Sequence, residues 1–408
     1  MSEGAAPVGA ASAVEGVFRE AYGQAVATLV RVFGDITLAE DAVQDAFTIA
    51  TERWRRNGIP PNTAGWIVTT AKNRAIDTLR RSARGQELHE ELTLTMLPHD
   101  MAVGDREEET PAGDDLLRLI FTCCHPSLSE EHRVALTLRL MAGLSVNEVA
   151  RSFLVSDSAM AKRLVRAKYK IRAAKIPYRV PAEADLPGRL HSVLSVLYLI
   201  YNTGLGDVVR SSLRAEALRL ARALFQLMPD EPEVAGLLAL MLLSESRAKV
   251  RNSDGDLVLI RDQDRARWDR TMIDEGQGIV RACIRRGRPG PYQLQAAIQA
   301  VHCHAETFEQ TDWVQIVELY DHLFSLMPTP VVALNRAIAI AEVRGPEVAL
   351  SEIEPIRGDL DGYHLMHATR GAFLRRLGRV EEAGAAYRRA ADLAPTDADR
   401  RFLVSQID

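Results

Sequence analysis

Hydrophobic residues recur with helical spacing between residues 38 and 54, and polar residues occupy the opposite side of the same segment. This spacing predicts an amphipathic helix with Asp35 or Thr37 as its N-cap. The expected buried stripe comprises Leu38, Ala42, Val43, Ala46, Phe47, Ala50 and Trp54. The polar face carries Asp41, Gln44, Asp45 and Thr48. From spacing alone, this acidic face is either solvated or a docking surface for a basic partner helix.

A second amphipathic helix is predicted from Trp66 to Arg81, after a loop at residues 57–65 that is rich in proline, asparagine and glycine. Its polar face is a candidate nucleic-acid surface, because Asn and Arg side chains bind base edges as well as phosphates. That face carries Asn73, Asp77, Arg80, Arg81 and Arg84. Trp66 either packs in the core or stacks on an unpaired base. We expect Asp77 to form a surface ion pair with Arg80 or Arg81.

Residues 145–174 have the pattern of a helix-turn-helix. Ser145 and Glu148 have capping-box spacing and start a short helix that ends near Ser152. After a connection at residues 153–155, where Leu154 predicts a wider turn than usual, Ser156 is placed to cap a long basic helix. The second helix of such a motif enters the major groove with its N-terminal end. The residues expected to meet DNA are Ser156, Asp157, Ser158, Ala159, Lys162, Arg163 and Arg166.

The last part of the chain, residues 185–408, is helical in pattern and rich in alanine and leucine. Residues 364–395 fit a tetratricopeptide-type repeat, a helix pair that leaves a groove for peptides when repeats stack. Asp254-Gly255 predicts a hairpin turn, with residues 257–260 as a strand. Residues 253–256 lack the spacing of a calcium loop. The charged cluster at residues 261–270 is either a buried ion-pair network or a partner surface.

Composition and charge add a second line of evidence. The chain has 408 residues, a net charge of −5 and 47% hydrophobic residues. Five basic residues and one acid lie between residues 72 and 84, ten acids and one basic residue between 87 and 115, and nine basic residues and one acid between 151 and 179. Two basic modules separated by an acidic linker are typical of a protein that binds a polyanion at two places.

Several classes of protein are disfavoured by the sequence. The longest apolar stretches, such as residues 235–243, are shorter than the roughly 18 residues that cross a bilayer, and the N-terminus lacks the features of a signal peptide. Four cysteines indicate a reducing, cytoplasmic location rather than a disulfide scaffold. The spacing of zinc ligands is absent from Cys123-Cys124-His125 and from His302-Cys303-His304. We therefore expect the thiols in the core and the imidazoles at the surface. Phosphate-loop and hydrolase motifs are absent from the sequence, so we expect no enzyme, cofactor or metal.

Residues 14–177 resemble an RNA polymerase sigma factor of the small, extracytoplasmic-function type. The stretch LAEDAVQDAFTIA (38–50) resembles the polymerase-binding helix of that family, AGWIVTTAKNRAIDTLRR (64–81) its helix for the near promoter element, and LSVNEVARSFLVSDSAMAKRLVRAKYKIR (144–172) its upstream-element helix-turn-helix. The resemblance implies that Asp41, Gln44, Asp45 and Thr48 bind polymerase. It also implies that the near promoter element is contacted by Asn62, Trp66, Asn73, Arg74, Asp77, Arg80 and Arg81.

The whole chain resembles the subgroup of these factors that carries a C-terminal helical-repeat extension. We therefore expect an all-α fold with four parts: a region 2 domain at 1–84, an acidic linker at 85–112, a region 4 domain at 113–177 and a tetratricopeptide-like domain at 185–408. The expected partners are core RNA polymerase, promoter DNA as duplex and melted strand, and a peptide or protein in the C-terminal groove. The alternative is a helix-turn-helix regulator or repeat scaffold that does not engage RNA polymerase.

Overall fold

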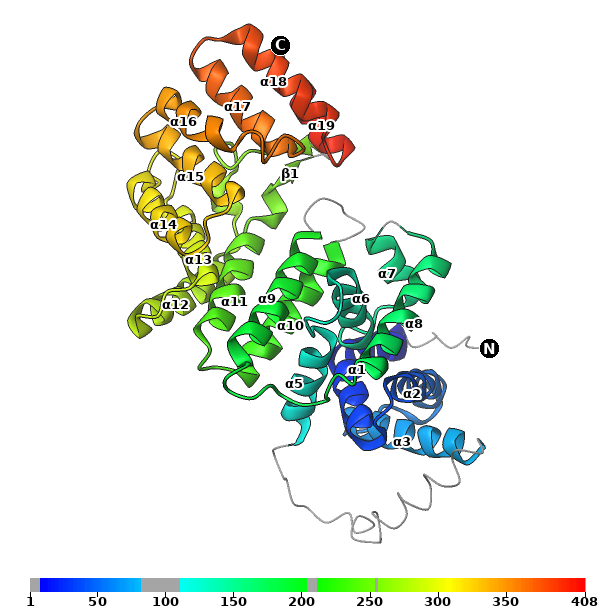
Figure 1. The fold of residues 1–408 in the computed structure, drawn as a ribbon. Coiled ribbons are helices and arrows are strands. Elements are labelled where there is room, and N and C mark those ends of the chain that lie inside the picture. The colour runs from blue at the N-terminus through cyan, green and yellow to red at the C-terminus, as the bar shows by residue number, and fades with distance from the viewer. Residues whose placement is uncertain (1–7, 82–110, 154, 204–210, 254–255, 408) are drawn as a thin grey trace, which may run out of the picture. The chain divides into compact units, whose positions relative to one another are not determined.

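The computed structural model describes residues 8–81, 111–153, 155–203, 211–253 and 256–407. The chain divides into two compact units, residues 1–220 and 221–408, and each is built of helices (Figure 1). The expected all-α fold class is confirmed. The first unit contains α1 (Val8–Phe33), α2 (Ile36–Asn57), α3 (Thr63–Arg81), α5 (Pro111–Cys123), α6 (Glu130–Leu140), α7 (Val146–Ser152), α8 (Asp157–Ala173), α9 (Leu186–Thr203) and the first part of α10 (Ser211–Leu227).

Helices α1, α2 and α3 pack together at the N-terminal end of the first unit (Figure 1). Gly34 has a φ of 68° and ends α1, and the Asp35 carboxylate then accepts hydrogen bonds from the backbone nitrogens of Thr37 and Leu38. Asp35 is therefore the N-cap of α2, as one of the two alternatives predicted. The buried face of α2 contains Ala39, Glu40, Ala42, Val43, Ala46, Phe47, Ala50 and Trp54. Most of the predicted stripe is thus confirmed.

The predicted helix-turn-helix is formed by α7 and α8. Ser145 and Glu148 make both hydrogen bonds of a capping box, which fixes the start of α7. The Ser156 hydroxyl accepts from the backbone nitrogen of Ala159 and caps α8. The side chain of Asn147 on α7 donates to the carboxylate of Asp157 on α8, so the two helices are linked directly. Leu154, at the expected wide turn, lies outside the described residues.

Helix α9 packs against α5 and α6 in the first unit. Its apolar residues Leu190, Val193, Leu194 and Leu197 are buried, and Arg189 donates to the backbone oxygen of Phe121 at 2.6 Å. The sequence placed the start of the C-terminal domain at residue 185, whereas the two compact units divide between residues 220 and 221. The difference arises because the apolar face of α9 is buried on helices that precede it.

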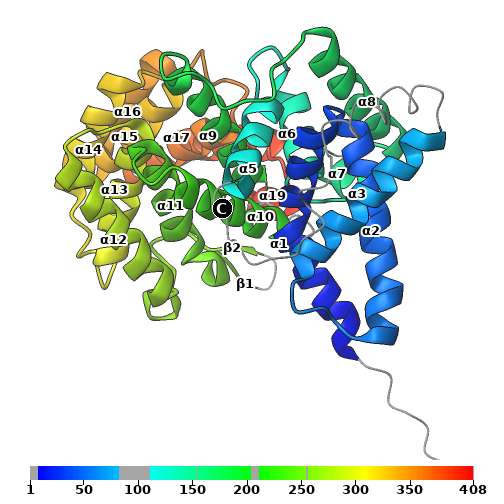
Figure 2. The same cartoon turned by 90° about the horizontal axis from the view of Figure 1, so that it is seen from below.

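The second unit consists of helices that mostly pack against their neighbours in sequence (Figure 2). Besides the end of α10 it contains α11 (Pro232–Glu245), α12 (Arg270–Arg286), α13 (Pro291–His304), α14 (Trp313–Leu326), α15 (Pro330–Val343), α16 (Pro346–Ile353), α17 (His364–Arg376), α18 (Val380–Asp392) and α19 (Asp397–Val404), with short 3-10 turns at Ala248–Val250, Arg265–Arg267 and Glu354–Ile356. A Cβ atom at Gly371 would lie 3.1 Å from the ring of Tyr387, so glycine allows the close approach of α17 and α18. This helix pair spans the segment that fits the repeat pattern.

A short hairpin is the only β-structure among the described residues. Strand β1 (Asn252–Ser253) pairs antiparallel with β2 (Asp256–Leu257). The expected strand at residues 257–260 is wrong beyond Leu257, because the backbone of Asp262 bonds back to Leu259 and turns the chain. Residues 254 and 255, and with them the excluded calcium loop, lie outside the described part.

The charged cluster at residues 261–270 has a structural role centred on Arg265. Its side chain is buried and donates to the backbone oxygens of His302 and Ala305, at 2.8 and 2.9 Å. It also lies over the ring of Trp268, 5.1 Å from the centroid. Arg265 therefore caps the C-terminal end of α13, where a cation favours the exposed carbonyls. The centre of the cluster is thus buried against helix carbonyls and an aromatic ring, which matches neither a buried ion-pair network nor a partner surface.

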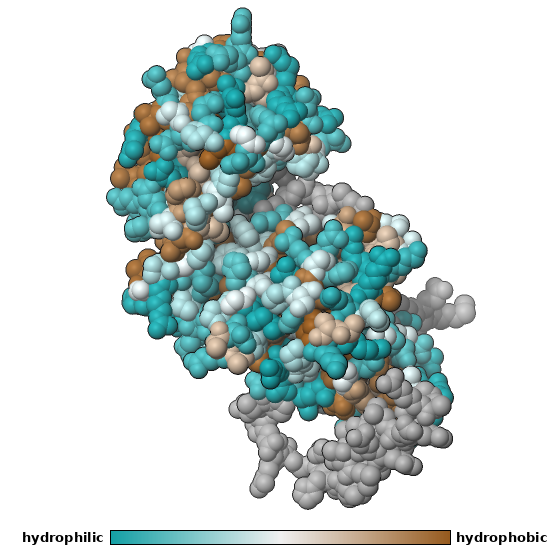
Figure 3. Space-filling view, in the orientation of Figure 1, coloured by the Kyte–Doolittle hydropathy of each residue, from teal (hydrophilic) through white to brown (hydrophobic). Residues whose placement is uncertain are grey.

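Within the described ranges, no helix is long and apolar enough to cross a membrane. The face of the molecule in Figure 3 is largely hydrophilic, and its hydrophobic residues form small scattered groups.

Candidate nucleic-acid and protein interface

The acidic face of α2 is solvent-facing. Asp41, Asp45 and Thr48 are exposed and Gln44 is half-buried, so the four side chains predicted to bind polymerase lie on one accessible stripe. Partial burial and the neighbouring Glu40 raise the pKa of Asp41, while Lys168 acts in the opposite direction. The stripe is a surface of concentrated negative charge with a rigid helical backbone beneath it.

Behind this stripe lies a buried acid that sequence reasoning missed. Glu40 is 4% exposed and accepts a hydrogen bond from Arg139 of α6 at 2.6 Å. Its other carboxylate oxygen forms an ion pair with Lys168 of α8. Nearby, Asp35 pairs with Arg172 of α8 at 2.8 Å. A signal was present in the sequence, because Glu40 stands three residues before Val43 and seven before Phe47, on the apolar side of its helix.

On α3 the candidate DNA side chains differ in accessibility. Asn73, Arg80 and Arg81 are exposed, while Arg74 and Asp77 are half-buried. The expected ion pair between Asp77 and Arg80 or Arg81 is not formed among the described residues, so this prediction is wrong. These arginines therefore remain available to an external anion.

At the head of α3, Asn62 and Trp66 have structural roles. The Asn62 side chain accepts from the backbone nitrogen of Gly65 at 2.8 Å, which caps the first turn of the helix. Trp66 is half-buried and packs edge-on against Trp54, with ring centroids 5.4 Å apart. Of the two alternatives for Trp66, the core contact is present, and the residue is only partly buried.

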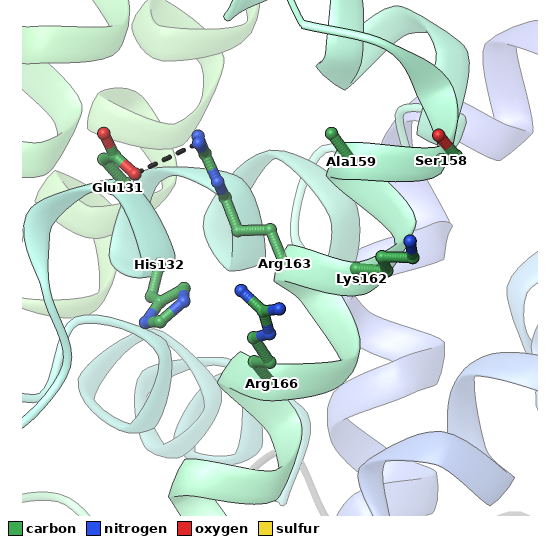
Figure 4. Close-up of a pocket in the computed structure, with 7 residues that line it drawn as sticks. All are labelled: Glu131, His132, Ser158, Ala159, Lys162, Arg163 and Arg166. Carbon is green, nitrogen blue, oxygen red and sulfur yellow. Dashed lines mark ion pairs between the residues drawn. The ribbon is translucent and has the colours of Figure 1, made fainter.

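The basic face of the helix-turn-helix contains a pocket of about 380 Å³ (Figure 4). Its lining from α8 comprises Ser158, Ala159, Lys162, Arg163 and Arg166, all predicted DNA contacts. Glu131 and His132 of α6 complete it, and neither was singled out from the sequence. Two further predicted contacts have local partners, since Ser156 caps α8 and Asp157 accepts from Asn147.

No group of three or more His, Cys, Asp or Glu side chains in the described part of the chain could hold a metal ion. The four cysteines are free and buried, as expected of core thiols. The expectation of surface imidazoles is wrong for His302. Burial, Arg247 and Arg265 lower its pKa to about 3, so the ring is neutral and packs against Trp313.

Comparison with known families assigns the two modules. The model of sigma-70 region 2 matches residues 17–85, which include most of α1 and all of α2 and α3, and that of sigma-70 region 4 matches residues 118–171, which include α6, α7 and most of α8. Residues 189–284 match a family of unknown function (DUF6596). The chain belongs to the sigma-70 family and carries a C-terminal extension, as the sequence motifs indicated.

A relative matches this chain over most of its length. A protein of Rhizobium meliloti (strain 1021), named uncharacterized protein R00370, is 43% identical over 392 residues, which are 94% of this chain and 93% of the relative. Membership of the sigma-70 family supports a role in transcription initiation, with RNA polymerase and promoter DNA as partners. Proteins of this family are transcription factors rather than enzymes.

Proposed function

We propose that this chain is a sigma factor of the extracytoplasmic-function type, which binds core RNA polymerase and directs it to specific promoters in the cytoplasm. The observation that carries the proposal is the acidic stripe of α2 inside a sigma-70 region 2 match. The stripe is exposed along one face, while the opposite face of the same helix is buried. An exposed acidic helix face is complementary to a basic helical surface of a partner.

The DNA roles follow the two basic faces. Asn73, Arg80 and Arg81 of α3 would contact the near promoter element and its melted strand. The N-terminal half of α8 would enter the major groove of the upstream element as duplex, where Ser158 and Lys162 are exposed. The functional parts would be region 2 at 1–84, the linker at 85–112 and region 4 at 113–177. The acidic linker would follow the polymerase path that nucleic acid also takes.

The C-terminal part, 185–408, would act as a tetratricopeptide-like module that contacts polymerase or controls the two DNA modules. A groove of about 460 Å³ borders α12, α13 and α14, and includes the side chains of Val280, Ile284 and Leu319. It is the place where a peptide or protein partner would bind. Removal of residues 228–408, which keeps α10 whole, should therefore change activity.

The proposal is tested by run-off transcription on fragmented genomic DNA with core RNA polymerase, with and without the full chain. We expect transcripts with defined 5′ ends that appear only when the chain is present. A regulator that binds DNA without engaging polymerase would retain fragments in a filter-binding assay and yield no new 5′ ends. That result would favour the alternative of a helix-turn-helix regulator.

A further inference from the structure

The pocket on the helix-turn-helix brings together side chains of two helices (Figure 4). Arg163 reaches across to α6, where it pairs with Glu131 at 3.2 Å and lies 5.1 Å from the centroid of the Phe153 ring. The guanidinium of Arg166 and the ring of His132 face one another. Lys162, one helical turn before Arg166, also lines the pocket. Arg163 is thus held in place, whereas Arg166 is exposed and directed into the pocket.

The pocket has the chemistry of an anion site. Three cationic side chains of α8 surround it, against a single carboxylate, Glu131, which is already bound to Arg163. Arginine forks and a neutral or charged imidazole are donors that match phosphate oxygens. In helix-turn-helix complexes most hydrogen bonds go to the DNA backbone, beside the groove that the second helix enters. A backbone phosphate is therefore the ligand that fits this place.

We propose that His132 and Arg166 bind one backbone phosphate of the upstream promoter duplex, with Glu131 positioning Arg163 beside them. This inference rests on the proposed binding of duplex DNA by the region 4 module. It adds a residue from α6, outside the two helices of the motif, to the DNA interface. It also gives Glu131 a role as a positioning residue, since Glu131 itself repels the phosphate.

The charges around His132 make this contact sensitive to pH. Partial burial lowers the pKa of His132, and Arg163 and Arg166 on α8 add to that effect, while Glu131 on its own helix opposes it; Lys162 is the other cation of the pocket. In the free protein the ring is therefore neutral near pH 7. A bound phosphate raises the pKa, so binding is coupled to uptake of a proton. Affinity for duplex DNA should then increase as the pH falls, by at most about tenfold for each pH unit.

The test measures the Kd of the full chain for a fluorescent DNA duplex by anisotropy, between pH 7.5 and 5.5 at constant ionic strength. We expect the wild type to gain about fivefold or more in affinity beyond the gain of His132→Gln. His132→Lys should bind tightly at both pH values. His191→Gln, an exposed histidine of α9 in the same unit, should behave as the wild type. Glu131→Gln, which releases Arg163 from its ion pair, should weaken binding at pH 7.5, and the gain at low pH that depends on His132 should remain.

Two further measurements distinguish a DNA phosphate from free phosphate, and the failure of this proposal from the failure of the proposed function. Inorganic phosphate at the same ionic strength should not displace the duplex; displacement at millimolar phosphate would show a site for free phosphate and overturn the assignment to DNA. Equal pH slopes for wild type and His132→Gln, with duplex binding intact, would overturn the role of His132 alone. Absence of duplex binding by the folded wild type would overturn both this site and the proposed function of the region 4 module.

Discussion

The contact between the region 2 and region 4 modules and the packing of the C-terminal helices differ in the charges that they bury. The first combines the packing of α1 against α5 with ion pairs: Glu40 lies buried between Arg139 and Lys168, and Asp35 pairs with Arg172. The second is apolar. Its core joins α13 to α19 through buried side chains such as Leu323, Ile340, Ile353, Met366 and Phe373, and ion pairs such as that of Arg336 with Asp321 lie at its partly exposed rim.

This difference determines how substitutions and salt affect the stability of each region. A buried ion pair gives little net stability over an apolar replacement, yet the loss of one partner is costly because a charge stays buried without compensation. An apolar core is indifferent to salt and sensitive to shape. Salt should therefore weaken the exposed pair of Asp35 with Arg172, while the buried pairs of Glu40 and the apolar core should respond little to it.

The largest effect is expected for Glu40→Ala. The change leaves Arg139 and Lys168 without their acid, and we expect the first unit to lose about 3–5 kcal/mol of unfolding free energy. Native-state amide hydrogen exchange measures it, because peptides from α2, α6 and α8 are read separately from the second unit. The triple variant Glu40→Leu/Arg139→Met/Lys168→Met is the control and should be close to the wild type. A loss as large in the triple variant would show that packing, not charge, holds the modules together.

In the apolar region the matching change is Gly236→Ala in α11. The added Cβ would lie 2.6 Å from the backbone nitrogen of Gln293, so α11 and α13 must move apart. We expect a cost of about 2–3 kcal/mol, measured by urea unfolding of the second unit. Gly278→Ala in α12 is the control, since nothing lies within 4 Å of its Cβ position, and it should stabilise the helix by about 0.5–1 kcal/mol. Equal effects of the two changes would contradict the close approach.

The third prediction concerns the stability of the second unit at low pH. The pKa of His302 in the folded chain, about 3, lies below the ordinary value of 6.5, so the unfolded chain binds a proton that the folded chain excludes. The neutral ring of His302 therefore contributes fully to the free energy of unfolding above pH 6.5. This contribution decreases as the pH falls, and roughly 2 kcal/mol of it is lost at pH 5. Urea unfolding at several pH values measures it. His302→Gln should remove this part of the pH dependence, and His304→Gln, an exposed neighbour, should leave it.

The smallest effect is expected for Arg172→Ala, which removes the exposed pair with Asp35. Exposed ion pairs contribute about 0–1 kcal/mol, and 1 M salt should abolish the difference from wild type. Lys170→Ala, an exposed cation of α8, is the control. Hydrogen exchange of α2 at low and high salt checks the result. A cost above about 2 kcal/mol that persists in high salt would indicate that this pair, too, is shielded from water.

Local features of the fold were predictable from sequence. The acidic stripe, the caps at Asp35, Ser145 and Ser156, and the two helices of the motif depend on residues that are close in the chain. Spacing and capping rules describe such short-range interactions.

The features that were missed depend on residues far apart. Glu40 and Arg139 are separated by 99 positions, and His132 enters the pocket only because α6 packs beside α8. The apolar face of α9 predicts burial without saying on which helices it is buried. Arg265 likewise looks like one charge among many until the end of α13 is placed against it. Each of these requires the tertiary arrangement, which charge pattern and periodicity do not provide.

The central claim is that the exposed face of α2 binds core RNA polymerase. The direct measurement is gel filtration of the purified full chain with bacterial core polymerase, for the wild type and for Asp41→Lys/Asp45→Lys. The matched control is Glu183→Lys/Asp185→Lys, which makes the same change of charge at two exposed acids before α9.

We predict that the wild type and the control elute with the polymerase and that the α2 variant, still helical by circular dichroism, elutes alone. Co-elution of all three proteins would contradict the assignment of the α2 face. Failure of the folded wild type to co-elute would contradict the proposal that this chain is a working sigma factor.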